Sequence, residues 1–251
     1  MIENVTEKLK YLDPISLDEL SDYKLLNRID TKYLCNESVL PSILEQAQKD
    51  FRVQTIGKKR IFKYESLYFD TPERKTYLDH HQGKRIRYKI RFRNYLDTGD
   101  TFLEIKKKRS YTRTDKKRNE FKFSPDLGEP HYDFIRKYID LPGETLTSTL
   151  WTVFDRITLA GRNHLERVTI DTGIRFRDRD HEILMPGLAI IEVKREKKGF
   201  ASPFTHILKE QSLKPYGISK YILGNILLVP GLKHNRFLRK VTTVNKICYG
   251  T

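Results

Sequence analysis

Cationic and apolar residues alternate strictly along the segment 84–95, KRIRYKIRFRNY. The odd positions carry five cations in succession: Arg85, Arg87, Lys89, Arg91 and Arg93. The even positions between them carry apolar or aromatic side chains: Ile86, Tyr88, Ile90 and Phe92. A period of two residues predicts a β-strand with one cationic face and one apolar face. Because neighbouring cations would lie roughly 7 Å apart, the pattern favours a polyanion along that face.

Five other segments show the same alternation of ionic and apolar positions: 28–33, 102–108, 118–123, 167–171 and 189–194. Most of their ionic residues are Lys or Arg, with an occasional carboxylate such as Glu104 or Glu192. For any one strand, the solvated face of an ordinary antiparallel sheet is an alternative interpretation. Repetition over six strands favours charged faces that line a closed barrel, in which cations bind phosphate oxygens and carboxylates hold a divalent metal.

Helices, further strands and turns are predicted from the rest of the pattern. Ser16-Leu-Asp-Glu19 has the capping-box pattern of a short helix, and 38–50 is amphipathic. We also expect strands at 62–70, 119–123, 174–177 and 188–194, a hairpin turn at 97–100, and helices at 203–213 and 218–229. The stretch 130–154 is expected to be mainly helical, with a break near Pro142.

This order of elements has no βαβ rhythm, so it indicates an α+β fold with an antiparallel sheet or barrel and helices packed outside. No repeat, linker or low-complexity tract divides the chain. We therefore expect one domain at 1–232, followed by a basic C-terminal tail at 233–251.

Charge is concentrated in one part of the chain. The net charge is +15, and residues 84–122 hold 15 Lys and Arg against 5 Asp and Glu. The hydrophobic content of 38% is enough for a core, which excludes a disordered polycation. A field of this sign attracts nucleotides, nucleic acid, polyphosphate or an anionic membrane, and charge alone does not choose among them.

Nothing in the sequence predicts export or membrane insertion. Cys35 and Cys248 have no motif spacing, which is typical of a reducing compartment. The N-terminus lacks the apolar core of a signal peptide, and no apolar run is long enough for a transmembrane segment. Glycine-rich phosphate loops, HExxH and GxSxG are also absent. We expect a cytoplasmic protein.

Nine segments together carry a family resemblance: RIDTKY (28–33), SLYFDT (66–71), RIRYKIRFRNY (85–95), LEIKKK (103–108), KKR (116–118), FDRITL (154–159), RVTIDT (167–172), IIEVK (190–194) and GISKY (217–221). In order and spacing they resemble the polyphosphate polymerase domain of the vacuolar transporter chaperone (VTC) family, part of the triphosphate tunnel metalloenzyme superfamily. The resemblance covers about residues 20–228.

The resemblance implies an eight-stranded antiparallel β-barrel whose basic lumen binds a triphosphate and whose acidic residues take Mn²⁺ or Mg²⁺. The substrate-contacting cations of the family would correspond to Lys32, Arg91, Arg93, Lys106, Arg156, Arg167 and Lys220. The metal-associated carboxylate would be Glu192. Further substrate-binding cations are expected at Arg28, Arg85, Arg87, Lys89, Lys108, Lys117 and Lys194.

One departure from the superfamily bears on activity. Its hydrolase and cyclase branches carry Glu-x-Glu-x-Lys on the first strand, whereas this chain has Arg28-Ile-Asp30-Thr-Lys32. A first strand with a single carboxylate is more similar to the first strand of the polymerase branch. The resemblance thus implies a polyphosphate polymerase that transfers the γ-phosphoryl group of ATP to a growing polyphosphate chain.

Two alternative functions remain open at this point. A tripolyphosphatase or nucleoside triphosphatase would use the same cations with water as the acceptor. A non-enzymatic module would bind polyphosphate or RNA, and single-stranded RNA would need exposed aromatic residues for stacking. The aromatic residues Tyr88, Phe92, Phe121 and Phe123 lie opposite the cations and are expected in the core. ATP and inorganic polyphosphate are therefore the expected partners, without specific nucleic acid.

Overall fold

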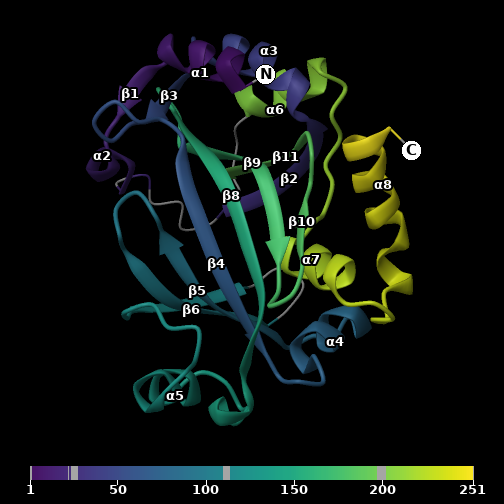
Figure 1. Cartoon of the computed structure of the whole chain (residues 1–251). Coiled ribbons are helices and arrows are strands. Elements are labelled where there is room, and N and C mark those ends of the chain that lie inside the picture. Colours follow the sequence, from purple (N-terminus) through teal and green to yellow (C-terminus); the bar gives the residue numbers. More distant parts are fainter. Residues whose placement is uncertain (1, 22, 24–27, 110–113, 197–201, 251) are drawn as a thin grey trace.

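The computed structural model describes residues 2–21, 23, 28–109, 114–196 and 202–250 (Figure 1). The strands are β1 (Asp13–Ile15), β2 (Arg28–Asn36), β3 (Phe51–Gln54), β4 (Phe62–Asp70), β5 (Arg87–Tyr95), β6 (Thr101–Lys108), β7 (Thr114–Glu120), β8 (Thr147–Gly161), β9 (Glu166–Arg177), β10 (Glu182–Leu184) and β11 (Leu188–Glu196). The α-helices are α1 (Ile2–Lys10), α2 (Leu17–Ser21), α3 (Leu40–Ala47), α4 (Lys75–Gln82), α5 (Glu129–Arg136), α6 (Pro203–Glu210), α7 (Lys220–Leu228) and α8 (Leu238–Tyr249). Short 3₁₀ helices are η1 (Glu37–Val39), η2 (Gly143–Thr145) and η3 (Asn235–Phe237).

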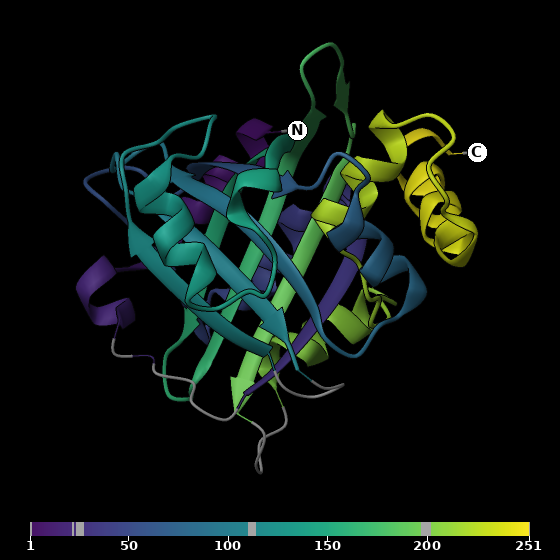
Figure 2. The same ribbon diagram turned by 90° about the horizontal axis from the view of Figure 1, so that it is seen from below.

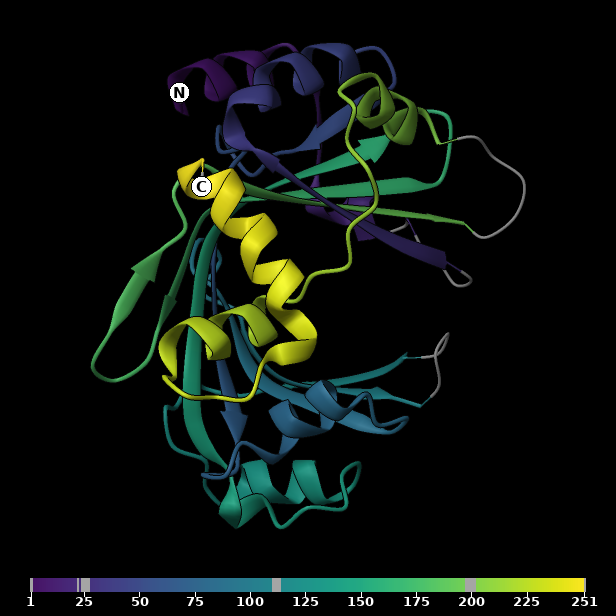
Figure 3. The same ribbon diagram turned by 90° about the vertical axis from the view of Figure 1, so that its right-hand side faces the viewer.

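Eight antiparallel strands form one curled sheet in the order β2-β11-β9-β8-β4-β5-β6-β7. Figures 2 and 3 show how the sheet bends round a central space, with the long strands β4 and β8 joining its two ends. β3 and β10 extend the sheet beside β8 and β9, and β1 pairs with β3 in parallel. The predicted α+β class and antiparallel eight-stranded sheet are confirmed. Within the described ranges, however, no backbone pairing joins the edge strands β2 and β7.

The outer face of the sheet is apolar and covered by helices. Ile90, Phe92, Leu103 and Ile105 are buried together with Phe134 and Ile135 of α5. At the other end of the sheet, Val193 is buried in a cluster that includes residues of α1, α3 and α6. Burial of one face forces the alternating cations onto the concave face. The polarity predicted from the sequence is therefore confirmed for these strands.

Helix α7 packs on the concave face of the sheet, where β8 and β9 are apolar. A Cβ atom at Gly224 would lie only 2.7 Å from Phe176 and 2.8 Å from Leu150, so glycine permits this close approach. Ser219 caps the helix by accepting a hydrogen bond from the backbone N–H of Ile222. This packing fixes the first residue of α7, Lys220, at the edge of the central space.

Several local predictions are corrected by the structure. Residues 147–154 belong to strand β8 rather than to a helix, and α5 ends at Arg136. The predicted strand 119–123 is instead β7, which begins at Thr114 because it pairs with β6. Arg85 and Ile86 precede β5, so the alternation of side chains begins at Arg87. The expected tail contains the packed helix α8, in which Val244 is fully buried.

The capping box predicted at the N-terminus is confirmed. The backbone N–H of Ser16 donates to Glu19 Oε2 at 2.9 Å, and the N–H of Glu19 donates to Ser16 Oγ at 3.2 Å. None of the described helices is both long and apolar enough to cross a membrane.

Candidate phosphate-binding cavity

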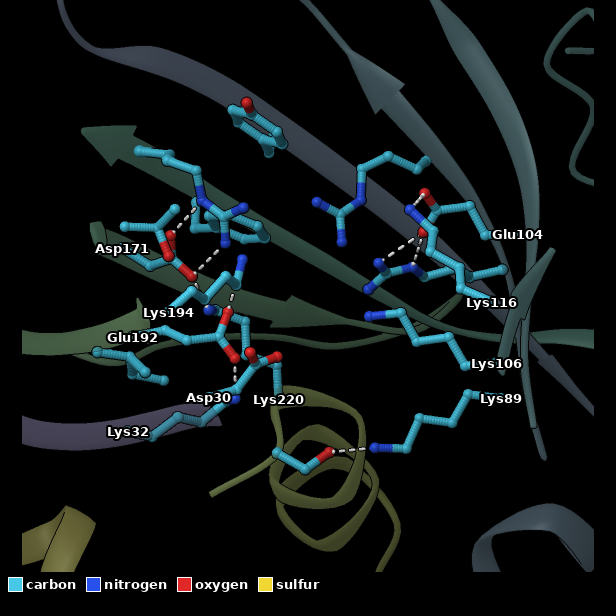
Figure 4. A pocket seen from close by; sticks show the side chains of 18 of the residues that line it. Asp30, Lys32, Lys89, Glu104, Lys106, Lys116, Asp171, Glu192, Lys194 and Lys220 are labelled. Carbon is cyan, nitrogen blue, oxygen red and sulfur yellow. Dashed lines mark hydrogen bonds and ion pairs between the residues drawn. The ribbon is translucent and has the colours of Figure 1, made fainter. Parts of the chain in front are cut away.

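The concave face of the sheet encloses a cavity of about 1380 Å³. This volume exceeds the roughly 300–1,000 Å³ of a site for a drug-sized ligand. Sixteen Lys and Arg residues and six Asp and Glu residues line it, a formal excess of ten positive charges. Figure 4 shows two groups of ionic side chains that face each other across the cavity. The space therefore suits a large, highly charged anion.

The first group, here the Glu192 cluster, comprises Lys32, Arg156, Asp171, Glu192, Lys194 and Lys220. Arg156 binds Asp171 with two parallel hydrogen bonds, Nε to Oδ1 at 2.6 Å and Nη2 to Oδ2 at 2.8 Å. Lys220 of α7 donates to the same Oδ2. Lys32 and Lys194 contact opposite oxygens of Glu192, the latter at 3.1 Å.

Cations hold the two carboxylates of this cluster ionised. Desolvation opposes ionisation of Asp171, but Arg156 and Lys220 lower its pKa far below the ordinary value. Lys194 and Lys32 overcome desolvation in the same way and lower the pKa of Glu192. For Lys220, burial dominates and lowers the pKa to about 8.

The second group, here the Glu104 cluster, comprises Lys89, Arg91, Arg93, Glu104, Lys106 and Lys116 on β5, β6 and β7. Glu104 is only 1% exposed. Its Oε2 accepts from Nε and Nη2 of Arg91 at 2.9 and 2.6 Å, and its Oε1 contacts Lys116. Desolvation opposes ionisation of Glu104, but Arg91, followed by Arg93 and Lys116, lowers its pKa strongly.

Besides Lys89, two cations of this cluster have no anionic partner among the described residues. Arg93 is 6% exposed, and its Nε is a buried donor without an acceptor there. Its guanidinium instead lies 5.6 Å from the ring of Tyr64, and burial lowers its pKa to about 10. Lys106 has a lowered pKa, first because of Arg91 and then because of burial. Unpaired buried cations are costly, so these two groups favour an incoming anion.

A third set of contacts joins the two walls at the start of α7. Lys89 donates from Nζ to Ser219 Oγ at 2.9 Å. Burial, followed by Arg91, lowers the pKa of Lys89 to about 7. Beside it, His80 is kept neutral because burial and the nearby cations, Lys89 foremost, lower its pKa to about 2. Lys89 and Ser219 therefore link β5 to the start of α7 beside the cavity.

The structure brings most of the predicted site residues to this cavity. The predicted residues that line it are Arg28, Lys32, Arg87, Lys89, Arg91, Arg93, Lys106, Lys108, Arg156, Arg167, Glu192, Lys194 and Lys220. Arg85 does not line it, because it lies before β5 and its Nε donates to the carbonyl of Arg109 at 3.3 Å. Lys117 points away, and its Nζ lies 5.7 Å from the ring of Tyr138 on the outer face.

Several residues that line the cavity were not predicted from the sequence. Lys116, adjacent to Lys117, points inward because the register of β7 pairs it with Lys106. Alternation starting at Thr114 would have found it. Asp171 stood on a predicted ionic face, but its partner Lys220 is 49 residues away and left no local signal. The same holds for Ser219.

The donor set is compatible with a hard divalent cation. Glu192 and Asp30 lie on the adjacent strands β11 and β2, and both line the cavity. Mg²⁺ is commonly held by one or two carboxylates together with substrate phosphates and water. Glu192 and Asp30 are the carboxylates that would hold such an ion. A separate group, Asp178, Asp180 and His181, follows β9 outside the cavity.

A curled antiparallel sheet round a cationic cavity defines a tunnel-type domain for phosphorylated ligands. The VTC domain family matches residues 27–229, which is most of the chain, and the protein therefore belongs to that family. The resemblance inferred from the nine sequence segments is confirmed.

Solved structures are similar to this chain at low sequence identity. A putative adenylate cyclase from Bacillus halodurans is 15% identical, with a TM-score of 0.51 over 78% of this chain and 95% of its own. A putative adenylyl cyclase from Hippeastrum, described as having a dominant triphosphatase activity, is 14% identical, with a TM-score of 0.48 over 83% of this chain and 100% of its own. Among curated proteins, none matches the sequence. The likeness to the Bacillus halodurans structure supports the assignment of the fold.

Proposed function

We propose that this protein is a polyphosphate polymerase that uses ATP as the phosphoryl donor. The terminal oxygen of a polyphosphate chain forms a bond to the γ-phosphorus of ATP, the bond from that phosphorus to the β–γ bridging oxygen breaks, and ADP leaves. The polymer is thereby one phosphate longer. The acceptor oxygen is already ionised, so the reaction needs little proton transfer.

The excess of positive charge in the cavity is the observation that carries this proposal. A polymerase must hold two polyanions at once, whereas a triphosphatase holds one polyanion and water. The formal excess of ten charges is more than one nucleoside triphosphate needs. The cations also occupy both facing walls, so donor and acceptor can be bound from opposite sides (Figure 4).

Positioning and charge stabilisation are the main tasks in phosphoryl transfer, because the transition state spreads negative charge over the equatorial oxygens. Arg93 and Lys106, which lack carboxylate partners, are assigned to those oxygens. Arg91 and Arg156 are held rigidly by Glu104 and Asp171, so their remaining N–H groups are preorganised. Lys32 and Lys220 act as point charges on the flanking phosphates.

A divalent cation fits beside Glu192 and Asp30, as described above. When bound, Mn²⁺ or Mg²⁺ supplies a positive charge that neutralises phosphate oxygens. The protein's part is to present these two carboxylates on adjacent strands, within the reach of Lys32 and Lys194.

The aromatic residues at the cavity argue against single-stranded RNA as the ligand. Bases would need free aromatic faces for stacking. The rings of Tyr64 and Phe154 instead lie beneath Arg156 at 4.9 and 5.1 Å, and the ring of Phe102 lies beneath Arg118 at 4.7 Å. These faces are already covered by guanidinium groups.

Product analysis tests the proposal directly. The protein is incubated with ATP and Mn²⁺ or Mg²⁺, and polyphosphate and orthophosphate are separated on a gel. Growth of polyphosphate with release of ADP is expected. Orthophosphate alone would identify a triphosphatase, and intact ATP at every metal concentration would identify a binding module.

Two adjacent lysines of β7 provide a matched pair of variants. Lys116 points into the cavity and contacts Glu104, whereas Lys117 lies on the outer face. Loss of one charge-assisted contact to phosphate lowers kcat/KM by about tenfold or more, so we expect that loss for Lys116→Met. Lys117→Met should remain within about twofold of the wild type. Equal effects of the two substitutions would contradict the assignment of the reaction to this cavity.

A further inference from the structure

The segment 215–220, here the seam segment, closes the cavity between the two ends of the curled sheet. The backbone N–H of Tyr216 donates to the carbonyl of Lys32 at 2.6 Å, and Pro215 lies opposite Tyr33 as an added bridge on the edge strand β2. Ser219 accepts from Lys89 on β5, and Lys220 donates to Asp171 on β9. One short segment therefore touches three strands of the cavity wall, each through a residue of the proposed site.

Helix α8 holds the seam segment from outside. The hydroxyl of Tyr216 donates to the carbonyl of Arg239 at 3.2 Å and lies 3.0 Å from Thr243 Oγ1. Lys240 donates from Nζ to the carbonyl of Gly217. Figure 3 shows α8 lying across this side of the molecule, outside α7 and the seam segment. Phe237, Lys240 and Val241 reach far enough inward to line the cavity.

Contacts elsewhere fix α8 independently of the seam segment. Val244 is buried in the same apolar cluster as Leu34 of β2 and Leu188 of β11. Asn36 donates to the carbonyl of Ile247 at 3.0 Å, and Arg236 donates to the carbonyl of His81 at 3.1 Å. The C-terminal end of α8 is thus tied to β2, and η3, which leads into α8, is tied to α4. Helix α8 also lies outside the residues 27–229 that match the VTC domain.

We propose that α8 is a brace for phosphate binding and that Tyr216 is the positioning residue through which it acts. This inference rests on the proposed function of the cavity. Tyr216 does not line the cavity, yet its backbone N–H binds the carbonyl of Lys32, and Ser219 and Lys220 follow within four residues in the sequence. Phosphate would pull on Lys220 and Lys32 from inside, and the hydroxyl bond to α8 resists that pull.

The brace has a kinetic consequence. A displacement of about 1 Å at a phosphate-binding group can reduce the rate by about 100-fold, because in-line geometry is lost. The single neutral hydrogen bond of Tyr216 supplies a smaller share, about threefold to tenfold. Its removal is therefore expected to weaken triphosphate binding moderately and to lower kcat more than it raises KM.

The test compares two Tyr→Phe substitutions at contacts with α8. Tyr216→Phe removes the hydroxyl that meets Arg239 and Thr243. Tyr249→Phe removes a hydroxyl near the carbonyl of Leu184, 3.5 Å away at the exposed end of the helix. We expect the Kd of inorganic tripolyphosphate, measured by calorimetry, to rise about threefold to tenfold for Tyr216→Phe alone. Amide hydrogen exchange at residues 217–221 should accelerate in the same variant.

A double-mutant cycle shows whether the effect passes through α8. Thr243→Val removes the partner hydroxyl on the helix, so the double variant Tyr216→Phe/Thr243→Val should be no worse than Tyr216→Phe. Additive losses, or an unchanged Kd and unchanged exchange in Tyr216→Phe, would overturn the proposal. Binding and exchange need no turnover, so these readouts stand even if ATP is not converted to polyphosphate.

Discussion

Replacement of Glu104 by glutamine tests how the empty cavity tolerates its positive charge. The carboxylate is buried and is shared by Arg91 and Lys116. Glutamine keeps the size of the side chain but removes the charge. The amide oxygen can still accept from Arg91, as the hydroxyl of Tyr68 does at 2.9 Å, but Arg91 loses its negatively charged partner among these contacts.

The expected loss follows from the burial of this pair. Removing one partner of a buried ion pair costs about 3–5 kcal/mol, because the other charge stays buried without compensation. The side chain of Arg91 is 11% exposed at the cavity wall, so the lower value of about 3 kcal/mol applies. For a protein of this size, 1 kcal/mol corresponds to about 2–4 °C in Tm. Glu104→Gln should therefore lower Tm by about 6–12 °C.

Thermal unfolding with and without tripolyphosphate provides the assay. At 100 times its Kd, a ligand that binds only the folded state adds about 2.7 kcal/mol of stability. Phosphate supplies the negative charge that the glutamine variant lacks, so the Tm difference between variant and wild type should shrink with ligand. Glu120→Gln, at an exposed position of β7 outside the cavity, is the control. An unchanged Tm for Glu104→Gln, or a difference that persists with ligand, would refute the reasoning.

The remaining predictions concern protons and metal. Because the pKa of Lys89 is lowered to about 7 in the folded protein, its stability contribution improves as pH rises from about 7 to 10.5. Its positive charge for phosphate is lost earlier, as pH rises through about 7. Binding of tripolyphosphate at pH 8 should consequently be accompanied by proton uptake, which calorimetry in buffers of different ionisation enthalpy measures. Lys89→Met should lose part of that uptake. Lys220, with a pKa of about 8, should account for the rest. An identical uptake in Lys89→Met would contradict the lowered pKa. Glu192→Gln should weaken Mn²⁺ binding at least tenfold, followed by electron paramagnetic resonance in the presence of tripolyphosphate, while tripolyphosphate alone still binds; retention of wild-type Mn²⁺ affinity would remove Glu192 from the metal site.

The polarity of the sheet could be predicted because β5 separates its charges cleanly. Arg91 and Arg93 alternate with Ile90 and Phe92, and only one arrangement buries the apolar set. Strand β7 has no such contrast: its sequence, TDKKRNE, is polar at every position. The alternation that places Arg118 on the ionic face extends back to Lys116, and the pairing with β6 fixes Lys116 opposite Lys106.

Other errors arose where tertiary packing changes the pattern. The first half of β8 is covered on both faces, since Leu150 packs with α7 residues and the neighbouring Trp151 packs on the opposite cluster. A strand that is apolar on both faces has no period of two, and a helix was predicted there. The packing of α8 and the contacts of Ser219 depend on residues far away in the sequence, so no local pattern could reveal them.

The internal ion pairs mean that the cavity binds an anion by exchange: the anion takes over contacts that the wall's own carboxylates make with the lysines. An incoming phosphate competes with Glu192 or Asp171 for the N–H groups of each lysine that these carboxylates hold. A small monovalent anion offers one charge in exchange and gains little. A linear phosphate chain presents many charges at short, regular intervals, so it can exchange with several lysines in succession. The wall would thus discriminate among anions by the number of linked charges.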